Sequence, residues 1–189
     1  MAARRARTLI LLRHAKSAWP EGVPDHDRPL GPRGRRDAPV AGQWMRLSGY
    51  VPDHVLCSTA LRARETWQLA EPELGTQPPV SFEREAYEAS AAELLDLIRR
   101  LPAAARTVAV VGHDPALPEV ALALAADQKP SHSAAPADAL DRLREKFPTA
   151  AIAVLELGGP WSLLRPGSAR LAAFVTPRDM GRRYSGKAG

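Results

Sequence analysis

Two histidines in this chain each follow directly on a short apolar segment. Arg13 and His14 come after the apolar run 8–12, and His113 comes after the β-branched run 107–111. Runs of this length and composition predict strands that are buried on both faces of a sheet. Ligand sites in open α/β sheets lie at the carboxyl ends of the strands. The sequence therefore predicts that Arg13, His14 and His113 meet at one edge of a sheet.

A third cationic residue follows another predicted strand. Residues 55–57 form a short apolar run, and Arg62 falls in the first turn of the helix predicted after it, with Ser58 or Thr59 as its cap. Arginine binds phosphate oxygens through paired hydrogen bonds and stays charged, and helix N-termini attract anions. If the three strand ends converge, two arginines, two imidazoles and a helix N-terminus form a site that suits a phosphate group.

Such a site would also set the protonation of a nucleophilic imidazole. A histidine attacks phosphorus only through an unprotonated ring nitrogen. Nearby arginines disfavour the imidazolium because like charges repel. We expect the second ring nitrogen of His14 to donate to a backbone carbonyl, which would fix the tautomer.

The elements that position these residues alternate along the chain. Besides the strands already named, strands are predicted at 80–82, 150–157 and 171–175, and helices at 30–48, 60–70, 91–101 and 116–126. Strands alternating with helices imply a three-layer α/β/α sandwich with a mostly parallel central sheet. Pro39 conflicts with a regular first helix, so we expect a kink or a later start there.

The length of 189 residues fits one domain that spans 1–189, with an ordered core from about 7 to 176. The net charge is +5, and much of the excess lies near the two ends. We expect the basic tail from Pro177 to fray. Residues 127–138 are rich in Pro, Ser and Ala and predict a loop, and the sequence leaves open whether this loop closes over the site.

Composition argues against several other classes of protein. The basic ends could contact nucleic acid or an anionic membrane, but no aromatic residues are interleaved with them to stack on bases. No apolar run approaches the ~20 residues of a membrane span. Cys57 is the only cysteine, which rules out an internal disulfide and fits a reducing compartment. We expect a cytoplasmic protein without a nucleic-acid or membrane partner.

No cofactor or metal is expected either. The histidines and the cysteine lack the spacing of zinc ligands, and no glycine-rich nucleotide loop is present in the sequence.

Three stretches resemble a known family. The segments LLRHAKS, CSTALRARET and VVGHDP are similar to the histidine phosphatase superfamily, which has the phosphoglycerate mutase-like fold. The closer resemblance is to the small SixA-like phosphohistidine phosphatases. It covers nearly the whole chain through DHDRPLGPRGRRDA, AYEAS and FPTAAIAVLEL. Ala15 stands where the common RHG motif has glycine, a variation that itself resembles the SixA-like group.

The resemblance implies a metal-independent phosphatase in which His14 is transiently phosphorylated. Arg13, Arg62 and His113 would then bind the phosphoryl oxygens and stabilise the charge in transit. Glu88 in AYEAS is the candidate that protonates the leaving group and afterwards activates water, although it could equally be an exposed loop carboxylate. Ser17 lies where related enzymes have a phosphate-contacting serine, or it caps a loop.

Other polar and aromatic residues are open to two interpretations. His26, together with Asp25 and Asp27, could line the mouth of the site or serve structure alone. Trp19 and Trp161 could flank the substrate, although packing in the core or a loop is the simpler expectation.

The resemblance makes phosphohistidine in a protein the leading substrate, and a small phosphate ester is the alternative within the same fold. A mutase is disfavoured because the chain lacks the long insertions and the further acidic motif of such enzymes. A non-catalytic phosphate-binding or interaction module is the alternative of another class. The intact set of Arg13, His14, Arg62 and His113 argues against a pure binder, which would need no nucleophile. The sequence does not predict the oligomeric state.

Overall fold

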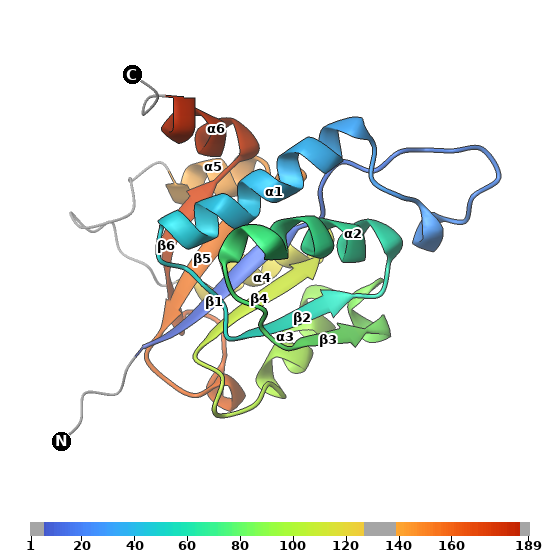
Figure 1. Cartoon of the computed structure of the whole chain (residues 1–189). Coiled ribbons are helices and arrows are strands. Elements are labelled where there is room, and N and C mark those ends of the chain that lie inside the picture. Colours follow the sequence, from blue (N-terminus) through green and yellow to red (C-terminus); the bar gives the residue numbers. More distant parts are fainter. Residues whose placement is uncertain (1–5, 127–138, 186–189) are drawn as a thin grey trace.

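The computed structural model describes residues 6–126 and 139–185. A six-stranded sheet lies at its centre, in the order β3-β2-β4-β1-β5-β6 (Figure 1). The strands are β1 (Arg7–Arg13), β2 (His54–Ser58), β3 (Val80–Glu83), β4 (Thr107–Gly112), β5 (Ile152–Leu157) and β6 (Ala169–Val175). Neighbouring strands from β3 to β1 pair in parallel, whereas β5 pairs antiparallel with both β1 and β6.

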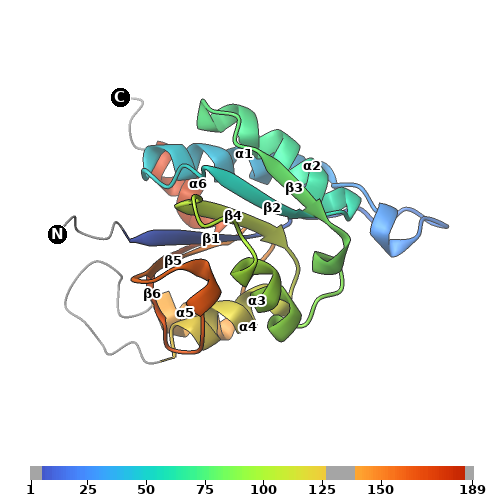
Figure 2. The ribbon, with the colours of Figure 1, turned by 90° about the horizontal axis from the view of Figure 1, so that it is seen from below.

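Helices cover both faces of the sheet. They are α1 (Pro32–Leu47), α2 (Leu61–Ala70), α3 (Ala91–Arg99), α4 (Ala116–Leu124), α5 (Ala139–Glu145) and α6 (Pro177–Ser185). Helices α1, α2 and α6 lie on one face, and α3, α4 and α5 lie on the other (Figure 2). The predicted α/β/α sandwich with a mostly parallel sheet is confirmed, and the antiparallel edge and α5 are additions that the sequence did not predict.

The apolar run of β1 is explained by its central position. Leu9 and Leu11 pack into the core under α3 and α4, while Ile10 and Leu12 pack into the core under α1 and α2. A strand covered on both faces has no polar side, so its sequence is a continuous apolar run rather than an alternation of apolar and polar residues.

The segment from Pro177 does not fray as predicted. It forms α6 as far as Ser185, and the buried Met180 packs against the sheet. The backbone N–H and the hydroxyl of Thr176 both donate to Asp179 at 2.9 Å, which caps the helix, and Arg142 of α5 donates to the same carboxylate. Residues 186–189, and the loop predicted at 127–138, lie outside the described residues.

The later start predicted as one possibility for α1 and the predicted cap of α2 are wrong. Helix α1 begins at Pro32 and continues through Pro39, so no later start occurs. Burial of Ala41 and Trp44 on the same helix offsets the one hydrogen bond that Pro39 cannot donate. The N-cap of α2 is Ala60, and neither Ser58 nor Thr59 caps the helix through its side chain.

Strands β1, β2 and β4 are adjacent and parallel, so their carboxyl ends meet at the same edge of the sheet. The connection from β1 to α1, which contains the short 3-10 helix η1 (Asp25–Asp27), projects beyond this edge (Figure 1). An antiparallel bridge between Ser17 and Leu30 closes the base of this connection. Within the described ranges, no helix has the length and apolar character needed to cross a membrane.

Candidate active site

The sheet edge brings together the four residues that the sequence singled out. Arg13 ends β1, His14 follows it, His113 follows β4, and Arg62 lies in the first turn of α2. The rings of His14 and His113 have centroids 5.1 Å apart. The guanidinium of Arg62 contacts both, with Nε 3.4 Å from Nε2 of His14 and Nη2 3.5 Å from Nδ1 of His113. All four residues line one pocket of about 500 Å³.

The ring of His14 is held in one tautomer. Nδ1 donates to the carbonyl oxygen of Ala15 at 2.8 Å, so Nε2 carries the lone pair, which accepts a hydrogen bond from Nε of Arg62 at 3.4 Å. Only 8% of the residue is exposed, and burial lowers its pKa to about 3, with His113, Arg62 and Arg13 lowering it further and the Ala15 hydrogen bond acting against them. The predicted carbonyl contact is therefore present, and burial rather than the arginines is the main reason that the imidazole is neutral.

The backbone beside His14 is fixed by its neighbours. The amide of His14 donates to Gly112 of β4 at 3.0 Å, and the amide of Ala15 donates to the buried hydroxyl of Thr66 in α2 at 2.9 Å. Gly34 of α1 lies so close to the backbone of Lys16 that a Cβ would overlap its carbonyl oxygen. Contacts with β4, α2 and α1 thus fix the position of the His14 imidazole.

His113 is oriented by Ser58, a contact that the sequence did not reveal. Nε2 of His113 lies 2.8 Å from the hydroxyl of Ser58, which itself accepts from the amide of Ala60 at 3.3 Å. Because arginine only donates, Nδ1 of His113 accepts from Nη2 of Arg62, so the ring proton of neutral His113 lies on Nε2 and is donated to the hydroxyl of Ser58. Burial, followed by the charge of Arg62, lowers the pKa of His113 to about 4.

Arg13 is anchored at the opposite side of His14. Its Nη1 donates to the carbonyl of Phe147 at 2.6 Å, and its Nη2 lies 3.6 Å from the carboxylate of Asp114. Asp114 lines the pocket beside His113. The sequence analysis predicts a role for Arg13 but not this ion pair with Asp114.

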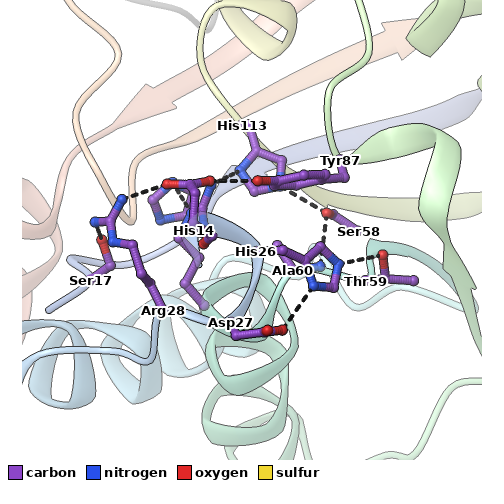
Figure 3. Close-up of polar contacts among 12 residues, drawn as sticks. His14, Ser17, His26, Asp27, Arg28, Ser58, Thr59, Ala60, Tyr87 and His113 are labelled. Carbon is purple, nitrogen blue, oxygen red and sulfur yellow. Dashed lines mark hydrogen bonds and ion pairs between the residues drawn. The ribbon is translucent and has the colours of Figure 1, made fainter. Parts of the chain in front are cut away.

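The two less direct candidates lie on the pocket wall. Glu88 is an exposed carboxylate beside Tyr87. Ser17 is buried, and its hydroxyl accepts from Nη2 of Arg28 at 2.5 Å (Figure 3). Ser17 therefore holds a cation at the site and does more than cap a loop.

Arg28 and Tyr87 are pocket residues that the sequence analysis did not single out. Both line the pocket, and Arg28 is only 6% exposed. Arg28 lies in the DHDRPLG segment, and a basic residue between Asp27 and Pro29 has no periodic context that would mark it as buried. Its guanidinium lies against Trp19, which is 74% exposed at the pocket.

Of the remaining aromatic and acidic candidates, some lie in the core and others line the pocket. Trp161 belongs to the core, with its indole N–H donating to Ala105 at 2.9 Å. Asp25 lines the pocket, whereas His26 turns to Thr59 and Asp27 (Figure 3). Among the described residues, no group of three or more His, Cys, Asp or Glu side chains is arranged to hold a metal ion.

Known proteins resemble this chain in sequence and in fold. The model of the histidine phosphatase superfamily (branch 1) matches residues 9–94. A solved structure from Nakamurella multipartitia, assigned to the phosphohistidine phosphatase SixA, is 38% identical, covers 91% of this chain and 96% of its own, and superposes with a TM-score of 0.77. The chain belongs to the histidine phosphatase superfamily. Its place there is SixA-like, as the sequence predicted, and it is a histidine-based phosphatase.

Two further relatives match most of the length of this chain. An uncharacterized protein of Mycobacterium tuberculosis is 44% identical over 167 residues, which is 88% of this chain and 100% of that protein. A structure from Agrobacterium tumefaciens, also assigned to SixA, is 28% identical with a TM-score of 0.74 and covers 90% of this chain and 98% of its own.

Proposed function

We propose that this phosphatase works without metal through a phosphohistidine formed on His14, and that its substrate is phosphohistidine in a protein. The observation that carries the proposal is the state of His14. Its Nδ1 donates to Ala15, burial keeps the ring neutral, and the lone pair on its Nε2 accepts from Nε of Arg62 at 3.4 Å. A neutral imidazole with an oriented lone pair beside a buried guanidinium is suited to attack a phosphoryl group.

In the first step, the lone pair on Nε2 of His14 forms a bond to phosphorus. The bond between phosphorus and the leaving group breaks, and the leaving group takes its electron pair and a proton. Arg13, Arg62 and His113 stabilise the charge on the phosphoryl oxygens in transit, which supplies most of the catalysis in phosphoryl transfer.

In the second step, water attacks the phosphorus of phosphorylated His14. The bond from phosphorus to Nε2 breaks, its electron pair returns to the ring, and inorganic phosphate leaves. Glu88 is the group that gives the proton in the first step and takes one from water in the second. Its place on the pocket wall supports this assignment.

The acidic groups of the pocket favour a phosphoramidate substrate. Asp25 and Asp114 are ion-paired with arginines, and Glu88 is exposed. Their ion pairs with arginines engage Asp25 and Asp114, so neither is available to protonate an alkoxide as it departs. An imidazole leaving group needs less help. The relatives assigned to SixA support the same substrate class.

A panel of substrates tests this proposal. The wild-type protein and Glu88→Gln are assayed in chelator with a phosphohistidine protein, an aryl phosphate and an alkyl phosphate. We expect wild-type activity in the order phosphohistidine, aryl, alkyl, with the smallest loss in Glu88→Gln for phosphohistidine. Preference for an alkyl phosphate would overturn the substrate assignment, and equal losses for all three would remove Glu88 as the proton donor.

A further inference from the structure

The guanidinium of Arg62 has two edges, and each faces a different group. The edge formed by Nη1 and Nη2 grips a single residue, with Nη1 donating to the backbone carbonyl of Asp25 at 2.7 Å and Nη2 to its carboxylate at 3.0 Å. The edge formed by Nε and Nη2 faces His14 and His113 across longer contacts of 3.4 and 3.5 Å. The five N–H groups of arginine have a fixed fork geometry, so holding one edge sets the direction of the other.

The carboxylate that grips Arg62 is itself held from two other directions. The hydroxyl of Tyr87 donates to its Oδ2 at 2.6 Å, and Nη1 of Arg28 donates to its Oδ1 at 2.7 Å. Arg28 in turn donates to Ser17 and, through Nε, to the carbonyl of Ala18 at 3.1 Å. The hydrogen bond from Tyr87, with Arg28 and Arg62, holds the pKa of Asp25 well below its usual range. Asp25 is thus an ionised and fixed support in a connection that otherwise projects from the body of the protein.

We propose that Asp25 is a positioning residue for phosphoryl transfer. By holding the Nη1/Nη2 edge of Arg62, it turns the Nε/Nη2 edge toward the space between His14 and His113, where the phosphoryl group would lie. Asp25 acts through Arg62, and no contact of its own with the phosphoryl group is required. This inference rests on the proposed phosphohistidine mechanism and adds to it a residue that makes the arginine fork ready before substrate arrives.

The charge of Asp25 has a second consequence that opposes the first. A carboxylate that lines the pocket repels an entering phosphate, whereas a fixed guanidinium loses less freedom when the phosphoryl group binds. If repulsion dominates, removing the carboxylate improves anion binding. If positioning dominates, removing it slows the reaction. The double contact to Arg62 and the added supports from Tyr87 and Arg28 favour positioning.

The neighbouring Asp27 offers a matched control. It lies in the same turn η1, its side chain is 64% exposed, and it bonds to the neighbouring His26. Asp25→Ala, Asp25→Asn and Asp27→Ala are compared with wild type for kcat and KM on an aryl phosphate and for the affinity of inorganic vanadate. Asparagine keeps an acceptor oxygen and the backbone carbonyl contact but lacks the charge.

We expect Asp25→Ala to lower kcat by about 10- to 100-fold, to change KM less, and to weaken vanadate binding. Asp25→Asn should recover part of kcat, and Asp27→Ala should match wild type. Tyr87→Phe, which removes one support and leaves the carboxylate, should lower kcat in the same direction by a smaller factor. The Tyr87→Phe variant therefore tests the inference even if Asp25→Ala fails to fold.

Two results would overturn the inference. One is that wild type is active and that both Asp25→Ala and Tyr87→Phe have the same kcat as wild type. The other is tighter vanadate binding with undiminished kcat in Asp25→Asn, which would show that repulsion dominates. Failure of the underlying mechanism looks different, because in that case His14→Ala would retain the activity of wild type.

Discussion

The hydroxyl of Thr66 joins the loop of His14 to the helix of Arg62. It accepts a hydrogen bond from the amide of Ala15 at 2.9 Å and donates one to the carbonyl of Arg62 at 2.6 Å, and the residue is fully buried. One small side chain therefore couples the position of the proposed nucleophile to the helix that carries its arginine.

Thr66→Val should remove this coupling at nearly constant volume. The amide of Ala15 would be left buried without a partner, so we expect the free energy of unfolding to fall by about 1–3 kcal/mol, together with a lower kcat because His14 and Arg62 are no longer held in register. Urea denaturation and steady-state kinetics measure the two effects. Thr66→Ser keeps the hydroxyl and should stay close to wild type in kcat. An unchanged free energy of unfolding in Thr66→Val would contradict the assigned role.

Arg62→Lys should lower kcat by about 10²- to 10³-fold, because lysine keeps the charge but loses the planar fork that faces His14 and His113. The exposed Arg64, two residues along the same helix, supplies the control as Arg64→Lys. Kinetics on an aryl phosphate, with circular dichroism to check folding, measure the difference. If Arg62→Lys and Arg64→Lys have the same kcat, Arg62 does not act on the phosphoryl group.

Gly34 and Gly42 of α1 form a natural pair for separating stability from activity. A Cβ at Gly34 would overlap the backbone of Lys16 beside the site, and a Cβ at Gly42 would overlap the backbone of Ala70 at the end of α2. We expect both alanine variants to lower the melting temperature, and Gly34→Ala to lose more kcat at a temperature where both remain folded. Equal residual kcat in the two folded variants would show that the Lys16 backbone does not position His14.

The pH dependence of kcat/KM should lack an acidic limb at the ordinary pKa of histidine. Burial lowers the pKa of His14 to about 3 and that of His113 to about 4. Both rings are thus neutral in the free enzyme when the pH is lowered through 6.5, and their protonation should reduce kcat/KM only near pH 4 and below. A rate profile corrected for ionisation of the substrate measures this. If kcat/KM of wild type falls as the pH is lowered through 6.5, and this fall is absent from His113→Asn, the ring of His113 is not neutral at that pH and the account is contradicted.

The same shifts predict how stability depends on pH. In the unfolded chain both rings titrate near 6.5, so between pH 6.5 and about 3 the unfolded state binds more protons than the folded state. The free energy of unfolding should therefore be highest above pH 6.5 and fall as the pH is lowered through this window. Replacing His14 by Asn should flatten this slope in denaturation curves. An unaltered slope in His14→Asn would argue against the low pKa.

Much of this architecture follows from local patterns in the sequence. The apolar runs that became β1 and β4 are long enough to identify, and their ends carry Arg13, His14 and His113. Parallel strands place such ends together, so the centre of the site could be predicted without tertiary information. The helix from Ala91 was equally predictable, because Ser90 and Glu93 form a capping box that is visible in the sequence.

The supporting residues could not be predicted in the same way. The sequence predicts Ser58 or Thr59 as a helix cap, and only the packing of β2 beside β4 turns the hydroxyl of Ser58 toward His113. Asp25 and Arg28 lie in a connection without periodicity, and their roles depend on contacts to Arg62 that are long-range in sequence. Helix α6 was missed because its signal, a cap from Thr176, gains its stability from burial of Met180 and from Arg142.

Trapping the phosphorylated protein tests the central claim most directly. Wild type and His14→Ala are mixed with an aryl phosphate in chelator, quenched in alkali within one turnover, and mapped by mass spectrometry. The mechanism predicts one acid-labile, alkali-stable phosphoryl group on His14 in wild type, and neither a phosphoryl group nor turnover in His14→Ala. A phosphoryl group on another residue, or undiminished turnover by His14→Ala, would contradict it.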